Sequence, residues 1–267
     1  MSKKKIIATV TGILVVIIGT YVGVDNNIYN NTYNELKEGQ TEISSFSKAK
    51  RLSAQVTATM DDTTFYCGCE YSVTNKSTGG GKTDLKSCEY DFRKNKKRAE
   101  RIEWEHIVPA SRSGKNLQCW NEGHSQCDKP GRECCAAVNE AYKYAQSDLH
   151  NLVPAIGEVN GDRSNLEFGI IQGEKREYGK CDVEINRDLD IVEPKEDIRG
   201  NIARTYLYMS ETYGIPLSEE EVKQYSIWNR SDPADREEKV RNTRIRNIQG
   251  TSNSYVTKSK VYYNYGN

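Results

Sequence analysis

Apolar residues in the C-terminal third of the chain recur at the period of an α-helix. The repeated positions are Ile198, Ile202, Tyr206, Met209 and Tyr213. Spacings of three and four residues place such side chains on one face of a helix. Gly214 and Pro216 follow, and both residues favour a helix end. The pattern therefore predicts an amphipathic helix that covers part of a core.

Further helices are predicted on both sides of this one. Ser218 and Glu221 have the spacing of a capping box, and Leu217 and Val222 have the spacing of a hydrophobic staple. A helix after these is predicted over 232–250. Earlier in the chain we expect helices over 46–57 and 136–149, a cysteine-containing strand region over 64–72 and a glycine-rich loop over 73–82.

The most informative polar pattern is Glu103-Trp104-Glu105-His106-Ile107-Val108-Pro109-Ala110-Ser111. It places two carboxylates and one imidazole beside an apolar run that a proline ends, which predicts a strand that carries functional groups. Neighbours on a regular strand point to opposite faces, so Glu105 and His106 would diverge. Irregular or edge geometry near Pro109 would let them converge. The alternative is that Trp104 and His106 lie in the core and the two glutamates lie in solvent.

A second polar stretch, residues 148–165, supplies groups that could complete a site with the first. Asn151 precedes Leu-Val-Pro, and Asn160 comes nine residues later, near a helix start indicated by Gly157. Arg163 follows. We expect it either to contact a phosphate or to form a structural ion pair with Asp162 or Glu167.

The N-terminus combines three lysines with an uncharged, mostly apolar run over 6–24. This pattern is typical of an export signal. The run is also nearly as long as a membrane span, which needs roughly 20 residues. A cleaved signal peptide and a retained anchor both remain open. We interpret 1–24 as signal peptide or signal anchor, 25–45 as a flexible tether because it is polar, and 46–260 as one folded domain.

The charge balance and the cysteine content indicate the partners and the redox compartment of the protein. Lys plus Arg and Asp plus Glu each number 38, so attraction to a polyanion must come from local patches. The densest basic run, 93–101, is either a phosphate-contacting segment or only a solvated face. The eight cysteines favour disulfides in an oxidising compartment. The alternative is a zinc site drawn from Cys119, His124, Cys127, Cys134 and Cys135.

Several stretches together resemble the endonuclease I family of secreted and periplasmic nucleases. They are the two polar stretches above, Tyr66-Cys67-Gly68-Cys69, Ile202-Ala203-Arg204-Thr205-Tyr206-Leu207-Tyr208-Met209 and Ile248-Gln249-Gly250. The resemblance implies a single mixed α/β (α+β) domain with a ββα-metal core covered by helices. It also implies a metal-dependent endonuclease without sequence preference.

The resemblance also implies roles for individual residues. His106 matches the general base, and Glu105 and Asn160 match the ligands of a divalent cation, for which we expect Mg²⁺, with Mn²⁺ or Ca²⁺ as alternatives. By analogy with related ββα-metal folds, Asn151 is expected to bridge the loop behind the strand of the base. Relatives often carry an arginine shortly after a Cys-Trp pair, and this chain does not, so Arg132 is the candidate replacement.

The resemblance finally implies a substrate and a compartment. We expect a periplasmic or secreted monomer that cleaves DNA and also RNA, with possible anchoring through 6–24. No recognition helix or zinc finger is visible, so base readout is not expected. Six cysteines match disulfide-bonded family positions, but Cys134 and Cys135 do not, and pairing is left open. The competing hypothesis is a non-catalytic nucleic-acid-binding protein on the same scaffold.

Overall fold

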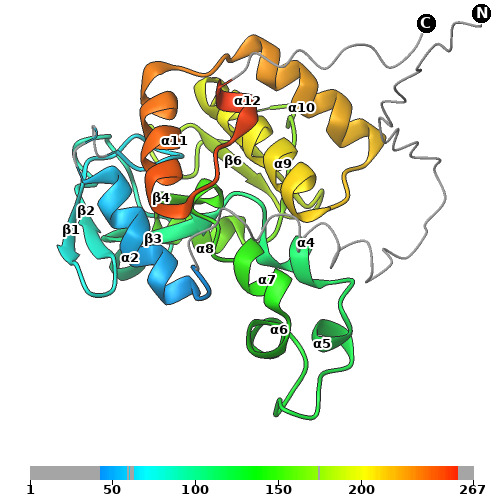
Figure 1. Ribbon diagram of the computed structural model, residues 1–267. Helices are drawn as coiled ribbons and strands as arrows, with labels where there is room; N and C mark the ends of the chain where they lie inside the picture. The colour runs from blue at the N-terminus through cyan, green and yellow to red at the C-terminus, as the bar shows by residue number, and fades with distance from the viewer. Residues whose placement is uncertain (1–42, 59, 61–62, 174, 258–267) are drawn as a thin grey trace, which may run out of the picture.

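The computed structural model describes residues 43–58, 60, 63–173 and 175–257 of the 267-residue chain. The expected export segment and nearly all of the expected tether lie outside these residues. Within them, no helix is both long enough and apolar enough to cross a membrane. Figure 1 shows the described chain as one body from which the segment with α5 and α6 projects at the lower end.

In the described part of the chain, seven strands form two sheets. The first sheet is antiparallel in the order β1-β2-β3-β4, and the second has the order β5-β7-β6 with a parallel β5–β7 pair. The strands are β1 (Tyr71–Asn75), β2 (Gly80–Thr83), β3 (Arg101–His106), β4 (Leu152–Ile156), β5 (Glu167–Phe168), β6 (Val183–Asn186) and β7 (Ile191–Pro194).

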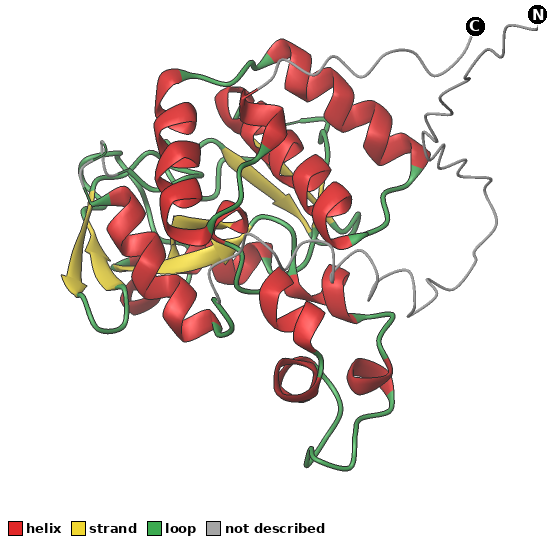
Figure 2. Ribbon diagram, viewed as in Figure 1, coloured by secondary structure: helices red, strands yellow, loops and turns green. Residues whose placement is uncertain are grey.

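Helices outnumber strands and lie above, below and in front of them (Figure 2). Together these elements give the expected mixed α+β class. The α-helices are α2 (Phe46–Thr57), α3 (Lys96–Ala99), α4 (Ala110–Gly114), α5 (Gln118–Asn121), α6 (Arg132–Val138), α7 (Glu140–Ala145), α8 (Gly157–Arg163), α9 (Arg199–Tyr213), α10 (Glu219–Ser231), α11 (Arg236–Gln249) and α12 (Ser254–Thr257). Two 3₁₀ turns are η1 (Leu149–Asn151) and η2 (Glu196–Ile198).

The apolar stripe of the C-terminal third does form a buried helix face. Its five residues are all at most 7% exposed, and α9 ends at Gly214, whose φ of 64° is easily adopted only by glycine. The predicted capping box at the start of α10 is present, with both hydrogen bonds between Ser218 and Glu221. The helices predicted over 46–57 and 232–250 correspond to α2 and α11.

Three local predictions differ from the structure. The strand region expected over 64–72 contains a turn at residues 65–67 and an isolated bridge between Thr63 and Glu70, and β1 begins only at Tyr71. The helix expected over 136–149 is divided into α6 and α7, because Asn139 has an extended backbone and its side chain caps α7 at the amide of Tyr142. The glycine-rich loop expected over 73–82 contains the end of β1 and most of β2. A Cβ at Gly81 would lie 2.3 Å from the carbonyl oxygen of Ser72, so this glycine allows the two strands to approach.

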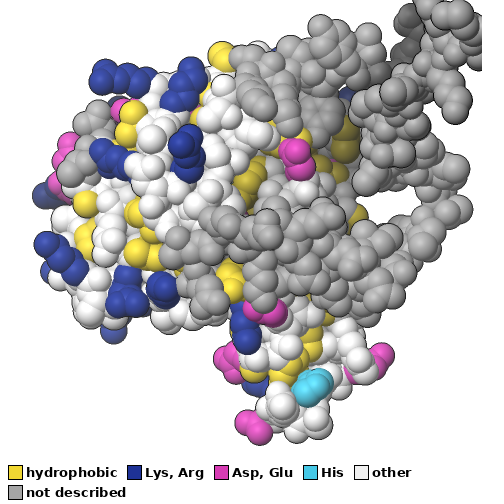
Figure 3. All heavy atoms as spheres, in the orientation of Figure 1, with side chains coloured by type: hydrophobic (Ala, Val, Ile, Leu, Met, Phe, Trp, Pro, Cys, Tyr) yellow, Lys and Arg dark blue, Asp and Glu magenta, His cyan; other side chains and the backbone are white. Residues whose placement is uncertain are grey.

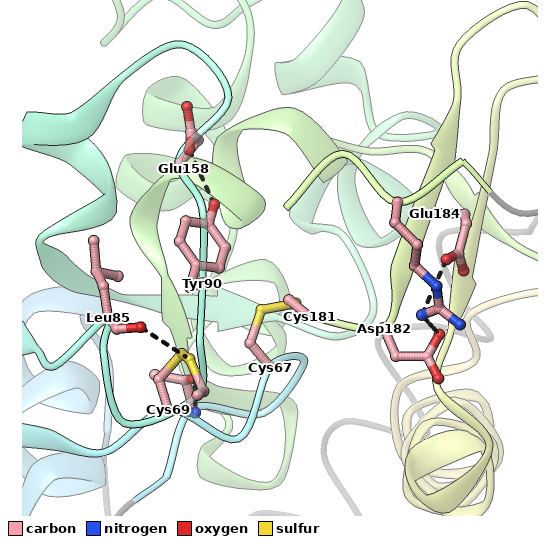
Figure 4. The surroundings of a disulfide bond; sticks show 11 residues. Cys67, Cys69, Leu85, Tyr90, Glu158, Cys181, Asp182 and Glu184 are labelled. Carbon is pink, nitrogen blue, oxygen red and sulfur yellow. Dashed lines mark hydrogen bonds and ion pairs between the residues drawn. A yellow bond between two sulfur atoms is a disulfide. The ribbon is translucent and has the colours of Figure 1, made fainter. Parts of the chain in front are cut away.

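All eight cysteines are paired, as expected for an oxidised protein. The disulfides are Cys67–Cys181, Cys69–Cys88, Cys119–Cys135 and Cys127–Cys134. Figure 4 shows the first two beside Tyr90, whose hydroxyl donates to Glu158 at 3.0 Å. The other two lie in the projecting segment. Because these cysteines are oxidised, the alternative of a zinc site among them is wrong.

Candidate active site

The strand that carries the candidate residues, β3, is only partly covered at one edge. It pairs with β4 from Ile102 to His106, but β2 reaches only Arg101 and Ile102. The edge beyond Ile102 is therefore open toward a cleft of about 670 Å³ that residues from both faces of β3 line. This edge geometry is how Glu105 and His106 reach one cleft although neighbouring strand residues point in opposite directions.

The cleft brings together side chains from several elements. The residues with candidate chemistry in its lining are Lys50, Glu103, Glu105, His106, Arg132 and Asn160. They come from α2, β3, α6 and α8. Four of them were expected in the site from the sequence, whereas Lys50 and Glu103 had no assigned role.

His106 is held by a single backbone contact. Its Nε2 lies 2.8 Å from the carbonyl oxygen of Gln146, and because a carbonyl can only accept, Nε2 must carry the proton. The unprotonated Nδ1 has no partner among the described residues. The ring is 8% exposed and lies 4.7 Å from the ring of Phe46. Burial and the nearby Arg132 lower the pKa of His106 to about 3, so the imidazole is neutral at physiological pH.

Glu105 is fixed through one of its two oxygens. Its Oε1 accepts hydrogen bonds from the Tyr66 hydroxyl and from Arg163 Nη1, each at 2.9 Å. The described residues offer no hydrogen-bond donor to Oε2, although Glu105 lines the cleft. Burial raises the pKa of Glu105, and the charge of Arg163 and the bond from Tyr66 act in the opposite direction. The side chain is therefore oriented through Oε1 alone.

Asn160 lies on α8 and is oriented by a carboxylate. Its Nδ2 donates to Glu103 Oε2 at 2.9 Å. Glu103 also accepts hydrogen bonds from Arg98 and Arg101. Burial alone would raise the pKa of Glu103, but these arginines outweigh it and lower the pKa. Glu103 shares a strand face with Glu105, which is the sequence signal that could have identified it.

Arg163 does not reach the cleft. It is 1% exposed, and besides Glu105 it donates to the carbonyl oxygens of His106 and Ile107, each at 2.8 Å. Its expected alternative role as a structural ion pair is therefore the one the geometry favours, but the partner is Glu105. Asp162 and Glu167, the partners expected from the sequence, bind other arginines.

Asn151 is a bridge behind the strand. Its Oδ1 accepts from the amide of Val108 at 2.7 Å, and its Nδ2 donates to the carbonyl oxygen of Val108 at 2.9 Å. The residue is 1% exposed and does not line the cleft. These two bonds connect the segment before β4 to the chain just after His106.

Arg132 lies at the cleft, at the start of α6. Its guanidinium is 5.0 Å from the ring centre of Phe46, and its Nε donates to Gln146 Oε1 at 3.3 Å. The same glutamine presents its carbonyl to His106. The two disulfides of the projecting segment flank Arg132 in sequence, so they restrict where this arginine can lie.

The basic run over 93–101 is largely engaged in the fold. Arg93 pairs with Asp162, and Arg98 and Arg101 pair with Glu103. Arg98 and Arg101 nevertheless line the cleft. The run is thus more than a solvated face, because it holds a side chain of the site.

No group of three or more His, Cys, Asp or Glu side chains suited to a metal occurs in the described part of the chain. The oxygens presented here are a different donor set, one carboxylate and one amide. Mg²⁺ binds through one or two carboxylates and keeps several waters, so this set fits such an ion. Hard oxygen donors of this kind do not fit zinc as well.

Comparisons with known proteins identify the relatives of this chain. A family model described as Endonuclease I matches residues 32–260. An Endonuclease-1 of Buchnera aphidicola is 45% identical over 216 residues, 81% of this chain and 82% of the relative. A periplasmic deoxyribonuclease of Aeromonas hydrophila is 45% identical over 196 residues, 73% and 78% of the two chains. An extracellular ribonuclease of Bacillus amyloliquefaciens is 30% identical over 149 residues, 49% and 48%.

Proposed function

Because the chain belongs to the endonuclease I family, we propose that this nuclease uses His106 as general base and a divalent cation held by Glu105 and Asn160. Its substrate is the phosphodiester backbone of DNA and RNA outside the cytoplasm. The observation that carries the proposal is the hydrogen bond from His106 Nε2 to Gln146, which leaves Nδ1 as a proton acceptor in the cleft.

His106 suits the activation of water. A base must be unprotonated at the working pH and must be fixed in direction. Burial keeps the imidazole neutral, and the Gln146 carbonyl selects the tautomer with a bare Nδ1. Asn151 adds to this by tying Val108, two residues beyond His106, to the start of β4.

We assign the cation to two oxygens to which no described residue donates a hydrogen bond. Glu105 Oε2 supplies the negative charge, and Asn160 Oδ1 supplies a neutral ligand. A bound divalent cation would offset the charge that develops on the phosphorus oxygens and on the departing 3′ oxygen. Nucleases of this family are generally divalent-metal dependent. Mg²⁺ is the ion we propose.

Substrate binding is assigned to phosphate contacts rather than base contacts. Lys50, Arg98, Arg101 and Arg132 all line the cleft. Figure 3 shows that Lys and Arg side chains also gather over α2 and α11 on one face, with few acidic side chains between them. Such charge attracts any nucleic acid and reads no sequence. Arg132 is the residue we assign to the phosphate at the leaving group.

The relatives support the breadth of substrate and the compartment. Those compared include a periplasmic deoxyribonuclease and an extracellular ribonuclease. Four disulfides also suit an oxidising compartment. The proposed substrates are thus DNA and RNA in the periplasm or outside the cell. Monomeric state and anchoring through 6–24 stay predictions from the sequence.

Plasmid cleavage tests the proposal. Purified protein is incubated with supercoiled DNA in Mg²⁺, with and without excess EDTA, beside the Asn160→Ala variant. We expect cleavage in Mg²⁺, none in EDTA, and weak cleavage by the variant at an unchanged melting temperature. Binding of DNA without cleavage under every divalent-ion condition would instead support the non-catalytic hypothesis.

A further inference from the structure

The amide of Asn160 has only one orientation that satisfies its carboxylate neighbour. Glu103 can only accept hydrogen bonds, so the amide nitrogen must face Glu103 Oε2 at 2.9 Å. The amide oxygen, Oδ1, is then directed elsewhere, and the described residues provide no donor to it. Without Glu103, the amide could turn over and present its NH₂ group where the oxygen had been.

Glu103 is itself firmly held. Arg98 donates from Nε to Oε1 at 2.8 Å and from Nη2 to Oε2 at 2.7 Å, which is a two-bond fork. Arg101 donates two further hydrogen bonds to Oε1. Asn160 and Arg98 therefore share Oε2, and the position of that oxygen is set before any ligand arrives.

The helix that carries Asn160 is shaped around this ion pair. Gly157 and Gly161 lie four residues apart, on one face of α8. A Cβ at Gly161 would lie 2.0 Å from Arg98 Nη1, and a Cβ at Gly157 would lie 2.9 Å from Glu103 Oε1. The missing side chains let the Arg98–Glu103 pair pack directly against the turn of Asn160. The glycines of this stretch thus serve the orientation of one amide.

We propose that Glu103, held by Arg98, is a positioning residue that turns the Asn160 amide so that its oxygen faces the divalent cation. The inference rests on the proposed function for the choice of Asn160 as a ligand. It adds that the affinity for the cation depends on amide orientation, and not only on the negative charge of Glu103.

A double-mutant cycle separates orientation from charge. Mn²⁺ binding is measured by electron paramagnetic resonance on the purified, oxidised full chain and on Glu103→Gln, Asn160→Asp and the double variant. Outer-shell partners of metal ligands are typically worth about 10–100-fold in affinity, so Glu103→Gln should weaken Mn²⁺ binding by that order. In the Asp background both ligand oxygens are equivalent, so the same change should weaken Mn²⁺ binding much less, through the loss of the Glu103 charge alone.

Two outcomes would overturn the proposal. Equal weakening in both backgrounds would mean that Glu103 acts through its charge alone, and no weakening in the Asn background would mean that it does not act on the cation. A failure of the ligand assignment itself looks different, because Asn160→Ala would then bind Mn²⁺ as tightly as the unmodified protein.

A second variant keeps the test independent of how Glu103→Gln folds. Arg98→Gln removes the fork that fixes Glu103, and we expect weaker Mn²⁺ binding. A purely electrostatic role predicts the opposite sign, since loss of a positive charge favours a cation, and tighter binding would therefore contradict the proposal. Arg101→Gln is the matched control: Arg101 contacts only Oε1, so its loss should not weaken Mn²⁺ binding, and thermal unfolding of each variant reports the fold.

Discussion

Among the described residues, two arginine–glutamate pairs are buried, Arg163–Glu105 and Arg204–Glu238, and their hydrogen bonding differs. Arg204 and Arg163 are both 1% exposed. Arg204 donates to both oxygens of Glu238, at 2.7 and 2.6 Å, and its remaining nitrogen reaches the carbonyl oxygen of Asp232. Arg163 reaches only Oε1 of Glu105, and its Nε has no hydrogen-bond partner in the described structure.

The difference separates a pair that holds the fold from a pair that prepares a site. A buried charge is costly unless its hydrogen bonds are complete, and the Arg204–Glu238 pair meets this condition between α9 and α11. Glu105 lacks a described donor at Oε2, on the oxygen we assign to the cation. The incompletely paired carboxylate is thus the one that we propose as a ligand of the cation.

The largest expected effect is on turnover. His106→Ala removes the proposed base, and positioned general-base catalysis is worth about 10²–10⁴-fold in rate. Turnover on plasmid DNA should fall by that order while Mn²⁺ still binds. A variant that remains folded and cleaves at the original rate would remove His106 from the mechanism.

His150 provides the matched control for that variant. It is also buried, at 2% exposed, and its Nε2 also lies near a backbone carbonyl, that of Thr251 at 3.2 Å. It is not in the cleft lining. His150→Ala should lower stability, with turnover per folded molecule unchanged.

Breaking the Arg204–Glu238 pair should lower the free energy of unfolding. Glu238→Ala leaves Arg204 buried without its carboxylate, and breaking such a pair costs about 3–5 kcal/mol. Urea unfolding followed by fluorescence should show this loss. Turnover per folded molecule should be retained, and a selective loss of turnover would mean that the helices and the site are coupled.

Weakening the Arg163–Glu105 pair should lower the affinity for the divalent cation. Arg163→Lys keeps the charge but loses the planar fork that binds Glu105 and two carbonyls together. Weaker anchoring of a ligand should lower Mn²⁺ affinity by about 10–100-fold. Unchanged affinity in an EPR titration would show that Glu105 does not need this anchor.

Much of this organisation could be predicted from residues whose effects are local. The stripe from Ile198 to Tyr213 and the capping box at Ser218 depend on spacing alone, and both are present. The three polar groups His106, Glu105 and Asn160 could be grouped by resemblance, and all three line one cleft. Disulfide bonding could be expected, but the pairing of Cys134 and Cys135 could not.

Long-range partners could not be predicted. Arg163 bonds to Glu105 across 58 positions, and Tyr66 reaches the same carboxylate across 39. Nothing in the sequence indicates that residues so far apart along the chain are in contact. The strand alternation could have placed Glu103 beside Glu105, but its contact with Asn160 on another element, 57 positions away, could not be predicted. The division of the 136–149 helix depends on the single cap at Asn139.

The smallest expected effect is that of mild acid. An unperturbed imidazole has a pKa near 6.5, but burial lowers that of His106 to about 3. The base therefore stays neutral as the pH falls from 7.5 to 5.5, and turnover should change little at saturating Mg²⁺. A roughly tenfold loss by pH 5.5, following a pKa near 6.5, would contradict the burial of His106.

Stability should respond to acid between about pH 6.5 and pH 3. The unfolded state binds a proton on His106 below about pH 6.5, whereas the folded state resists it until about pH 3. The contribution of His106 is thus present above pH 6.5 and is lost as the pH falls toward 3. Urea unfolding across this range measures it, and His106→Ala should reduce the slope.

The central claim, that the unbonded oxygen of Glu105 holds the cation, is tested most directly by Mn²⁺ titration of Glu105→Gln. Glutamine keeps the shape and can still accept a hydrogen bond from Arg163, but it removes the negative charge. We expect Mn²⁺ binding to be largely lost in this variant and unchanged in Glu238→Gln. Equal Mn²⁺ affinity in Glu105→Gln and the unmodified protein would contradict it.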